Sequence, residues 1–559
     1  MASLRKFHVV SSLFAILVLA PALAAQQTVT IRVEAGKGQG PLKPAWAYFG
    51  ADEPNYSYAP HGRELIAELA AATPAPVQIR VHNLLTSGDG EPALKWGSTN
   101  AYTEDASGNP VYDWKVIDRI FDGYLESGAK PFVEIGFMPQ ALSVQPDPYR
   151  HQWPKGELFT GWAYPSRDYG KWAELVHQLV LHCVSRYGKE EVGSWLWEVW
   201  NEPDIGYWKG TPQEYDKLYD YTVDAIRRAL PIAKVGGPAT TGPGHKKAAE
   251  FLRQFLEHCA NGENSATGKS GAPLDFVSFH AKGSPRVVEG HVRMGLANQL
   301  RDVDQGFAIV SSFPKFASLP IILSESDPEG CAACSAKTYP QNIYRNGTLY
   351  PAYTAAAIGS ILKLNQKHGT NLQGILTWAF EFEDQPYFSG FRTLATNGVD
   401  KPVLNVFRML GLMQGERVEA DSSGAVNVET MLDSGVRDAP DVDALAARSD
   451  HSLTVLVWNY HDDDVAAPEA AVNVEIAGLP SSADEVLVRH YRIDGNHSNA
   501  YTAWKDMGSP QNPTPEQYAK LKDAGQLQLL ESPRWSASDK LNLKFTLPRQ
   551  AVSLLELNW

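Results

Sequence analysis

The chain of 559 residues contains few cysteines and no concentration of positive charge. Its 50 Lys and Arg residues are outnumbered by 64 Asp and Glu, which gives a formal net charge of −14. This balance argues against nucleic acids and anionic membranes as partners. Beyond the first 25 residues, no apolar stretch is long enough to span a bilayer. We therefore expect a globular protein that binds neither nucleic acid nor membrane.

Four cysteines are too few to form a disulfide framework. Cys331 and Cys334 lie close enough in sequence to pair in an oxidising compartment, whereas the sequence leaves open whether Cys183 and Cys259 meet. A zinc site is not indicated, because no second Cys/His pair follows at ligand spacing. No thioredoxin-like unit surrounds the Cys-Ala-Ala-Cys segment either. We expect neither a metal nor a cofactor.

Residues 1–25 have the pattern of a secretory signal peptide rather than of a folded element. Arg5 and Lys6 precede an apolar run over residues 9–19, and Ala22-Leu23-Ala24 supplies the small residues of a cleavage site. The pattern predicts that the protein is exported and is either periplasmic or secreted.

Strands and helices alternate over residues 47–415. The predicted strands are Ala47–Ala51, Val77–His82, Lys130–Ile135, Ser194–Val199, Lys234–Pro238, Asp275–His280, Pro320–Glu325 and Gln373–Phe380. The amphipathic helices between them include Trp114–Ser127, Tyr169–Tyr187, Lys246–Cys259 and Tyr350–His368. Eight such alternations indicate a closed (β/α)8 TIM barrel. An open doubly wound sheet is disfavoured, because no glycine-rich phosphate turn follows the first strand.

The pattern changes after residue 415. Strands are expected to follow one another without helices, at Val426–Met431, Leu453–Asn459, Val472–Ala477, Glu485–Tyr491, Leu541–Leu547 and Val552–Leu557. Alternating apolar and polar residues separated by turn formers are typical of an antiparallel β-sandwich. We place this domain at residues 416–559 and expect the N-terminal strand segment, residues 26–46, to join it.

Glu202 stands at the centre of the stretch Trp197-Glu198-Val199-Trp200-Asn201-Glu202-Pro203-Asp204. The residues before it form an apolar strand, and Thr211 and Pro212 open the helix after it. Glu202 therefore lies at the C-terminal end of a parallel strand, where barrel enzymes collect their catalytic groups. Enclosed by Trp200 and Pro203, its carboxyl group suits a proton donor. A purely structural glutamate in a strand-to-helix turn is the alternative.

A second buried strand ends in a carboxylate at Glu325, within Pro320-Ile321-Ile322-Leu323-Ser324-Glu325-Ser326-Asp327. It lies three strands after Glu202, and in a closed barrel both strand ends open onto the same face. Two carboxyl groups on one face are the minimum equipment for glycoside hydrolysis, since one protonates the leaving oxygen and the other attacks the anomeric carbon.

The chain resembles glycoside hydrolase family 39, which includes β-xylosidases and α-L-iduronidase. The Trp200-Asn201-Glu202-Pro203 motif and the acid at the seventh strand are similar to those of the retaining barrel glycosidases. Residues 112–118 and 130–139 resemble the bacterial β-xylosidase branch. Residues 274–283 and 325–330 look more like the iduronidase branch. The resemblance covers about residues 50–413 and is weaker over the sandwich.

The resemblance implies a role for each matched residue. Glu202 matches the general acid/base and Glu325 the nucleophile, while Asn201 matches a residue that hydrogen-bonds the sugar hydroxyl beside the anomeric carbon. The sugar-binding and neighbouring positions are His82, His280 and Arg80. Each histidine alone would more often be a structural group. Arg80 can keep Glu325 ionised or form a plain barrel salt bridge.

Lys282, Gly330 and Arg392 resemble the clamp that holds a substrate carboxylate in iduronidase, whereas xylosidases tend to carry a tyrosine near Lys282. Two cations beside a sugar site favour an acidic substituent. Alternatively, Glu381 and Glu383 neutralise them and leave a pocket for a neutral sugar. The sequence leaves both possibilities open.

Trp378, at the end of the last strand, is a candidate platform on which a sugar ring stacks. The resemblance favours a retaining exo-glycosidase that removes terminal β-D-xylose from plant hemicellulose fragments. An α-L-iduronide or related uronide is the closest rival substrate, and an α-L-arabinoside is a third. A catalytically inactive barrel that only binds carbohydrate is the alternative from another class, although binding alone would require neither carboxylate.

Overall fold

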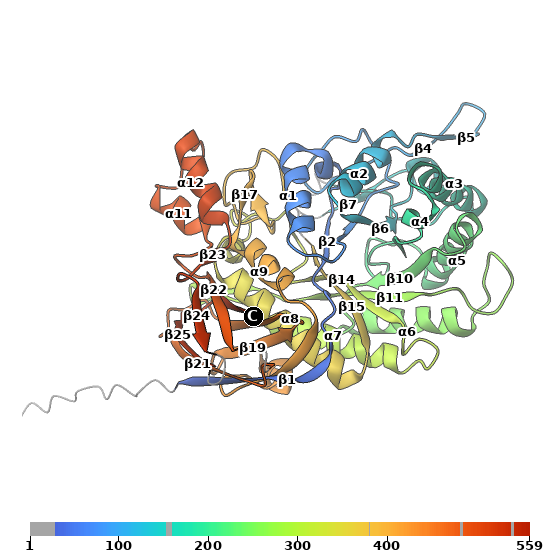
Figure 1. The fold of residues 1–559 in the computed structure, drawn as a ribbon. Helices are drawn as coiled ribbons and strands as arrows, with labels where there is room; N and C mark the ends of the chain where they lie inside the picture. The colour runs from blue at the N-terminus through green and yellow to red at the C-terminus, as the bar shows by residue number, and fades with distance from the viewer. Residues whose placement is uncertain (1–27, 152–158, 379–380, 481–483, 538–540) are drawn as a thin grey trace, which may run out of the picture.

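The computed structural model describes residues 28–151, 159–378, 381–480, 484–537 and 541–559. Within these residues the chain forms a closed parallel barrel and a separate, mainly antiparallel sheet, which lie side by side (Figure 1). The predicted signal peptide falls outside the described residues. In the described part of the chain, none of the helices has the length and apolar character needed to cross a bilayer.

The barrel confirms the predicted (β/α)8 architecture. Its eight strands close in the order β10-β11-β14-β15-β2-β3-β6-β9. They are β2 (Tyr48–Ala51), β3 (Gln78–Val81), β6 (Lys130–Ile135), β9 (Leu196–Val199), β10 (Lys234–Thr240), β11 (Phe276–Lys282), β14 (Pro320–Asp327) and β15 (Asn371–Trp378). Each coincides with a predicted strand, because strands buried on both faces have near-continuous apolar sequences. Residues 379–380, where the last prediction ended, lie outside the described residues.

Helices surround the barrel. They are α1 (Pro60–Ala71), α2 (Lys115–Glu126), α3 (Tyr169–Tyr187), α4 (Lys189–Val192), α5 (Pro212–Ala229), α6 (Lys246–Asn261), α7 (Leu296–Ser311), α8 (Leu349–His368) and α9 (Pro402–Gly411). Helix α5 begins where the sequence predicts, since Thr211 and Glu214 form a reciprocal capping box and Pro212 follows the cap. This firm start fixes the end of the loop that carries Glu202.

Short elements decorate the loops on the barrel. The paired ribbons are β4 (Tyr102–Glu104) with β5 (Pro110–Tyr112), β7 (Tyr149–Arg150) with β8 (Phe159–Thr160), β12 (Arg286–Val288) with β13 (His291–Arg293), and β16 (Ala395–Thr396) with β17 (Val399–Asp400). The 3-10 turns are η1 (Pro54–Tyr58), η2 (Gln140–Leu142) and η3 (Pro340–Asn346).

The second sheet has ten strands. They are β1 (Val29–Pro41), β18 (Glu416–Ser422), β19 (Asp441–Arg448), β20 (Ser452–Tyr460), β21 (Ala470–Ala477), β22 (Glu485–Ile493), β23 (Gln528–Leu529), β24 (Arg534–Ala537), β25 (Leu541–Leu547) and β26 (Ala551–Asn558). Strand β1 lies between β18, to which it is antiparallel, and β21, to which it is parallel. The N-terminal strand is therefore part of this sheet.

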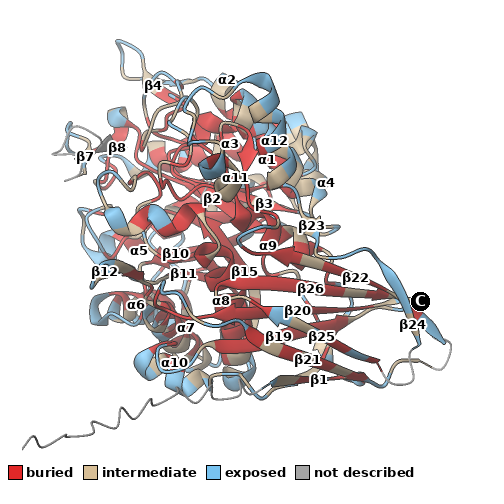
Figure 2. Cartoon of the chain, turned by 90° about the vertical axis from the view of Figure 1, so that its left-hand side faces the viewer, coloured by how far each residue is buried: buried red, intermediate tan, exposed pale blue. Residues whose placement is uncertain are grey.

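The sheet folds over on itself into two layers around one apolar core. The ring centroids of His490 on β22 and Phe545 on β25 are 4.7 Å apart, although these strands lie near opposite ends of the pairing order. On the barrel side, helix α8 packs against the sheet, and a Cβ on Gly359 would meet the ring of Trp458 at 2.6 Å. Figure 2 shows that the buried segments of the barrel and the buried strands of the sheet adjoin at α8.

The expectation of strands without helices in this domain was wrong. The segment predicted as strand Val426–Met431 forms helix α10 (Val428–Ser434), because the Asn427 side chain accepts a hydrogen bond from the Glu429 amide and caps it. Helices α11 (Ala500–Asp506) and α12 (Pro515–Gly525) also lie between β22 and β23. Thr514 and Gln517 form a capping box at the start of α12, a signal that was present in the sequence.

Candidate active site

Glu202 lies in a sharp turn directly after strand β9. Trp200 and Glu202 have φ angles of +71° and +45°, in the left-handed region that side chains other than glycine rarely adopt. The turn is held because the Glu202 amide donates to the Ala239 carbonyl at 2.9 Å and the Trp200 indole donates to the Tyr207 carbonyl at 2.9 Å. Backbone in such sparsely populated regions is concentrated at functional sites. The Glu202 side chain remains 15% exposed, open to the barrel mouth.

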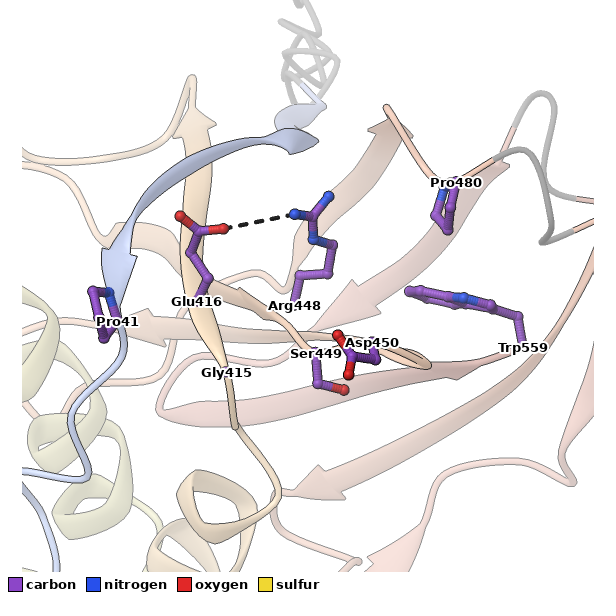
Figure 3. A pocket seen from close by; sticks show the side chains of 8 residues that line it. All are labelled: Pro41, Gly415, Glu416, Arg448, Ser449, Asp450, Pro480 and Trp559. Atoms are coloured by element: carbon purple, nitrogen blue, oxygen red, sulfur yellow. Dashed lines mark ion pairs between the residues drawn. The ribbon is translucent and has the colours of Figure 1, made fainter.

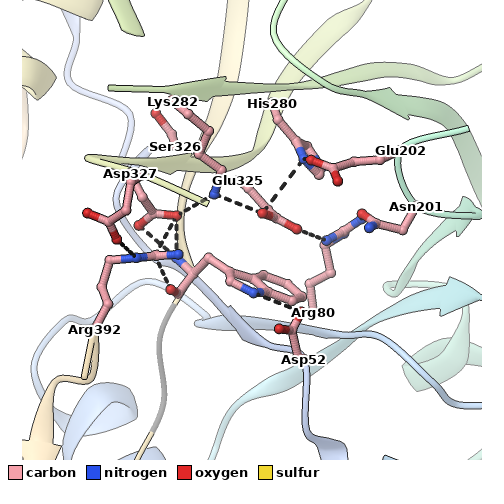
Figure 4. A network of polar contacts seen from close by, with 12 residues as sticks. Asp52, Arg80, Asn201, Glu202, His280, Lys282, Glu325, Ser326, Asp327 and Arg392 are labelled. Carbon is pink, nitrogen blue, oxygen red and sulfur yellow. Dashed lines mark hydrogen bonds and ion pairs between the residues drawn. The ribbon is translucent and has the colours of Figure 1, made fainter. Parts of the chain in front are cut away.

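Glu325 lies on strand β14 and is placed by its pairing with β11. In this register His280 pairs with Glu325, and Lys282 pairs with Asp327. The four side chains therefore project from two adjacent strand ends toward the same space (Figure 4). A carboxylate oxygen of Glu202, one of Glu325 and a ring nitrogen of His280 all lie within 4.8 Å of one another. The structure thus brings together the two carboxyl groups predicted to act in catalysis.

His280 links the two acids. Its Nδ1 lies 2.9 Å from Glu202 Oε1 and 3.7 Å from Glu325 Oε2. Such a trio has the spacing to ligate a cation, but the ammonium group of Lys282, 2.8 Å from Glu325 Oε2, already supplies positive charge there. His280 therefore orients Glu202 beside Glu325.

Arg80 reaches the nucleophile candidate, as predicted, but its shorter contacts are with two other acids. Its guanidinium lies 3.4 Å from Glu325 Oε1, 2.5 Å from Glu198 Oε2 and 2.8 Å from Glu134 Oε2. It also donates to Asn201 Oδ1 at 3.1 Å, which orients the residue matched to a sugar hydroxyl. Sequence reasoning missed Glu134 and Glu198. The available signal was a charged residue inside an otherwise apolar strand.

His82 lies beside Glu325 and is fixed from its other side. Its Nε2 is 3.3 Å from Glu325 Oε1, and its Nδ1 is 3.1 Å from Asp52 Oδ1. Asp52 also accepts from the Trp378 indole at 3.2 Å and forms an ion pair with the buried Lys95. Sequence reasoning missed both residues: Asp52 directly follows strand β2 and so carried a strand-end signal, whereas Lys95 lies in a loop and carried none.

The charges around Glu325 favour its ionised form. Burial alone raises the pKa of this carboxyl group, but electrostatic interactions with His280 and Lys282 and the contact with His82 outweigh burial and hold the pKa well below its usual range. A nucleophilic carboxylate must be ionised to attack. By contrast, burial raises the pKa of Glu134 to about 7, although His82 and the Arg80 guanidinium beside it oppose this shift.

The acids that neutralise Lys282 and Arg392 are different from those considered in the sequence. Lys282 Nζ lies 3.0 Å from Asp327 Oδ2, and Arg392 lies 2.8 Å from Asp327 and 2.7 Å from Glu329. The expected alternatives contact other groups, since Glu381 accepts from the Gly398 amide and Glu383 pairs with His61.

Gly330, the third residue of the expected clamp, is exposed, and a Cβ placed on it would meet no atom within 4 Å. Lys282 and Arg392 therefore both contact Asp327, whereas Gly330 lies in an exposed part of the loop after β14.

Trp378 lines the site but is only 1% exposed. The His82 ring lies 4.4 Å from its ring, and the Arg80 guanidinium lies 5.1 Å from it. In this structure Trp378 therefore supports His82 and Arg80 rather than offering an open face to a sugar. Tyr387 and Phe388, in the loop after β15, pack among residues of α11 and α12.

Cys331 and Cys334 form a disulfide, whereas Cys183 and Cys259 are separate, buried thiols. The disulfide closes the turn after Glu329. Arg345 donates to the carbonyl oxygens of both half-cystines, at 2.8 and 2.7 Å, and binds Glu329 at 2.6 Å. This turn therefore supports the Glu329–Arg392 pair from outside the barrel.

A groove of about 590 Å³ lies on the second domain rather than at the barrel mouth (Figure 3). It is lined by strand ends and turns of the sheet, with Trp559 and Pro480 on one side and the Glu416–Arg448 ion pair on the other. None of the residues around Glu202 and Glu325 lines it.

A closed (β/α)8 barrel with two carboxyl groups this close at the C-terminal ends of its strands is the arrangement of a barrel glycoside hydrolase. The chain belongs to glycosyl hydrolases family 39, whose family model matches residues 29–542. The protein is therefore a glycoside hydrolase.

Relatives with two activities are similar to this chain. A β-xylosidase of Geobacillus stearothermophilus is 28% identical over 469 residues, covering 81% of this chain and 82% of the relative. An α-L-iduronidase of Mus musculus is 25% identical over 585 residues, covering 97% of this chain and 83% of the relative. Among solved structures, a monomeric β-xylosidase of Caulobacter crescentus CB15 has a TM-score of 0.73 at 22% identity, covering 95% of this chain and 99% of the other, and supports the fold.

Proposed function

We propose that this enzyme is a retaining exo-glycosidase that removes terminal β-D-xylose from plant hemicellulose fragments. The single observation that supports retention is the approach of the Glu202 and Glu325 carboxylates to within 4.8 Å. Retaining enzymes hold their two carboxyl groups about 5–5.5 Å apart, and inverting enzymes separate them by about 6.5–9.5 Å to admit a water.

The proposed mechanism assigns one role to each acid. Glu325 attacks the anomeric carbon while Glu202 gives its proton to the leaving oxygen. Glu202, oriented by His280 at 2.9 Å, then removes a proton from the incoming water. Asn201, held by Arg80 at 3.1 Å, is positioned to bond the sugar hydroxyl beside the anomeric carbon.

A neutral glycone is favoured over a uronide by the pairing of the cations. Asp327 contacts both Lys282 and Arg392, and Glu329 contacts Arg392 a second time. A substrate carboxylate would have to compete with these buried acids for either cation, at the cost of uncovering a buried charge. The similar proteins include both β-xylosidases and α-L-iduronidases, so the choice of a neutral glycone depends on these contacts.

One assay tests both parts of the proposal. The purified protein is given nitrophenyl β-D-xyloside, α-L-arabinoside and α-L-iduronide at equal concentration, and we expect the xyloside to have the highest kcat/KM. Proton NMR of the first product should show β-xylose before mutarotation. First-formed α-xylose would contradict retention, and a preference for the iduronide would contradict the neutral glycone.

Variants of the two acids separate catalysis from binding. In Glu325→Ala we expect turnover to fall by at least about 10⁴-fold, and added azide should restore part of it by forming an inverted glycosyl azide. The exposed Glu429→Gln variant serves as a control that should keep full activity. Full turnover by Glu325→Ala would exclude Glu325 as the nucleophile.

We also propose that the protein is exported. The disulfide between Cys331 and Cys334 supports an oxidising compartment. Fractionation of producing cells should place the protein in the periplasm or the medium, and recovery in the cytoplasm alone would contradict export.

A further inference from the structure

His82 has a carboxylate oxygen beside each of its two ring nitrogens. Its Nδ1 lies 3.1 Å from Asp52 Oδ1, and its Nε2 lies 3.3 Å from both Glu325 Oε1 and Glu134 Oε2. A neutral imidazole carries a proton on only one nitrogen, whereas an imidazolium donates from both. Because an ionised carboxylate can only accept a hydrogen bond, acceptors on both sides favour the doubly protonated ring.

The packing around the His82 ring keeps it in this orientation. The ring is buried, with the centroid of the Trp378 ring 4.4 Å away and the Phe137 ring 6.0 Å away and nearly perpendicular. The His82 amide donates to the Ala51 carbonyl at 3.3 Å, which ties it to the residue before Asp52. The contact between Nδ1 and Asp52 is therefore part of a fixed arrangement.

Asp52 is itself held by groups from two other elements. Its Oδ1 accepts from the Trp378 indole at 3.2 Å, and its Oδ2 pairs with the Lys95 ammonium group. Lys95 has a φ of +59°, in the left-handed region, and its amide donates to Glu53 Oε1 at 2.7 Å. Backbone of this kind persists only where the surrounding contacts over-determine it. Here it directs the Lys95 side chain to Asp52.

Two cations near His82 oppose a positive charge on the ring. Arg80 Nη1 lies 3.3 Å from Nε2, and the Lys95 ammonium group lies beyond Asp52. Both cations are paired, since Arg80 lies 2.5 Å from Glu198 and Lys95 contacts Asp52. Their charges are therefore offset by acids of their own.

Two further titratable groups near His82 carry little charge at neutral pH. Burial lowers the pKa of His151 to about 3 and raises the pKa of Glu53 to about 8. The proton on Nδ1 therefore depends on Asp52, which contacts that nitrogen.

We propose that Asp52 is a positioning residue, which holds His82 as an imidazolium with its Nε2 proton directed at Glu325 Oε1. This proposal rests on the proposed double displacement, in which Glu325 is the nucleophile. The imidazolium orients the Glu325 carboxylate through a charge-assisted hydrogen bond and favours its ionised form. An aspartate that contacts the far nitrogen of a histidine sets the protonation of the ring in the same way in serine hydrolases.

The first test reads the two ring nitrogens of His82 directly. Nitrogen NMR of the full protein with labelled histidine distinguishes protonated from unprotonated ring nitrogens, and the signals missing in His82→Gln identify His82. At pH 7 we expect both nitrogens to be protonated in the wild type and only one in Asp52→Asn. The amide at position 52 removes the negative charge at nearly unchanged size.

The second test is the pH dependence of xyloside hydrolysis. Burial raises the pKa of Glu325, and the contact with His82 is among those that, with His280 and Lys282, hold it well below its usual range. A neutral His82 ring lets this pKa rise, so the carboxylate forms only at higher pH. In Asp52→Asn we expect the acidic limb of kcat/KM to move about one pH unit toward neutral pH. The plateau should fall about 10–100-fold, as for misplacement of a reacting group.

Two further variants separate positioning from folding. Asp52→Asn leaves the buried Lys95 without its partner, which can itself destabilise the fold. The double variant Asp52→Asn/Lys95→Met removes both charges together, so it should fold and still lose the Nδ1 proton. Glu53→Gln makes the same acid-to-amide change in the next residue, which accepts from the Lys95 amide. This control should keep the wild-type ring signals and pH profile.

A doubly protonated His82 at pH 7 in both Asp52 variants would overturn the proposal. A loss of activity with unchanged ring signals and an unmoved acidic limb would also overturn it, because Asp52 would then have only a structural role. A wild-type enzyme that hydrolysed no xyloside would contradict the proposed function instead. The ring signals distinguish that failure, since they are measured without substrate.

Discussion

The ammonium group of Lys282 lies 2.8 Å from Glu325 Oε2 and 3.0 Å from Asp327 Oδ2, so it bridges the two acids of strand β14. The bridge follows from strand pairing, because Lys282 and Asp327 are opposite each other in the β11–β14 register. A lysine that the sequence associates with a substrate carboxylate therefore contacts Glu325, the proposed nucleophile.

Replacement of Lys282 by methionine should move the acidic limb of the kcat/KM profile toward neutral pH. Lys282 is one of the charges that lower the pKa of Glu325, so its removal raises that pKa. The carboxylate is then ionised only at higher pH, and we expect a displacement of about one pH unit or more. A pH–rate profile with the neutral xyloside measures it.

Lys171→Met, which removes a cation paired with Glu104 on the outer surface, is the control and should leave the profile in place. If Lys282→Met affected only uronide substrates and left the xyloside profile unchanged, Lys282 would be a substrate clamp after all.

Replacement of His280 by alanine should impair substrates with poor leaving groups most. His280 holds Glu202 at 2.9 Å, and in the proposed mechanism Glu202 gives its proton to the leaving oxygen. Because acid catalysis contributes about 10²–10⁴-fold, we expect a loss of that order for alkyl xylosides and a far smaller one for dinitrophenyl xyloside. A plot of log kcat/KM against leaving-group pKa should become steeper. A uniform loss along the series would indicate that His280 acts on substrate binding instead.

Replacement of Asp327 by asparagine should destabilise the fold. Asp327 is buried and pairs with the fully buried Arg392 at 2.8 Å. Removal of one partner from a buried pair costs about 3–5 kcal/mol, which a denaturant titration can measure. Glu250→Gln removes an acid from an exposed pair with Lys246 and should cost less than about 1 kcal/mol. Equal effects of the two variants would show that burial of the Asp327 pair does not decide its contribution.

Replacement of Glu381 by glutamine should make stability less sensitive to pH between pH 5 and pH 8. Burial raises the pKa of Glu381 from 4.5 to about 8 in the folded protein. A raised pKa gives stability that is complete below the unfolded value and is lost as pH rises through the folded value, because the unfolded chain releases this proton first. Between pH 5 and pH 8 the wild type should lose about 1.4 kcal/mol per pH unit from this group, and the variant should not.

A glutamine at position 381 can still accept the hydrogen bond that Glu381 receives from the Gly398 amide at 2.7 Å, so the local structure should persist. Urea titrations at several pH values give the comparison, with Glu429→Gln as the exposed control. Parallel stability curves for wild type and Glu381→Gln would contradict the assigned pKa.

The sequence predicted the barrel well, because its strands are buried on both faces and its helices are amphipathic. A short, continuous apolar run is easily distinguished from the 3.6-residue apolar period of a helix. The C-terminal domain was harder to predict. A short segment such as Val426–Met431 suits a strand by its alternation, but the Asn427 cap decides for a helix. Local capping there overrides a weak strand pattern.

The sequence by itself predicted that Glu202 and Glu325 lie on one face of the barrel, because each follows or ends an apolar barrel strand, and the structure brings their carboxyl groups together. It also determined that cations lie near Glu325. Only the tertiary structure decided which acids neutralise those cations. The register of β11 and β14 places Lys282 opposite Asp327, and the turn closed by the disulfide places Glu329 beside Arg392. Contacts of this kind join residues far apart in the chain, and no local pattern encodes their distance or their burial.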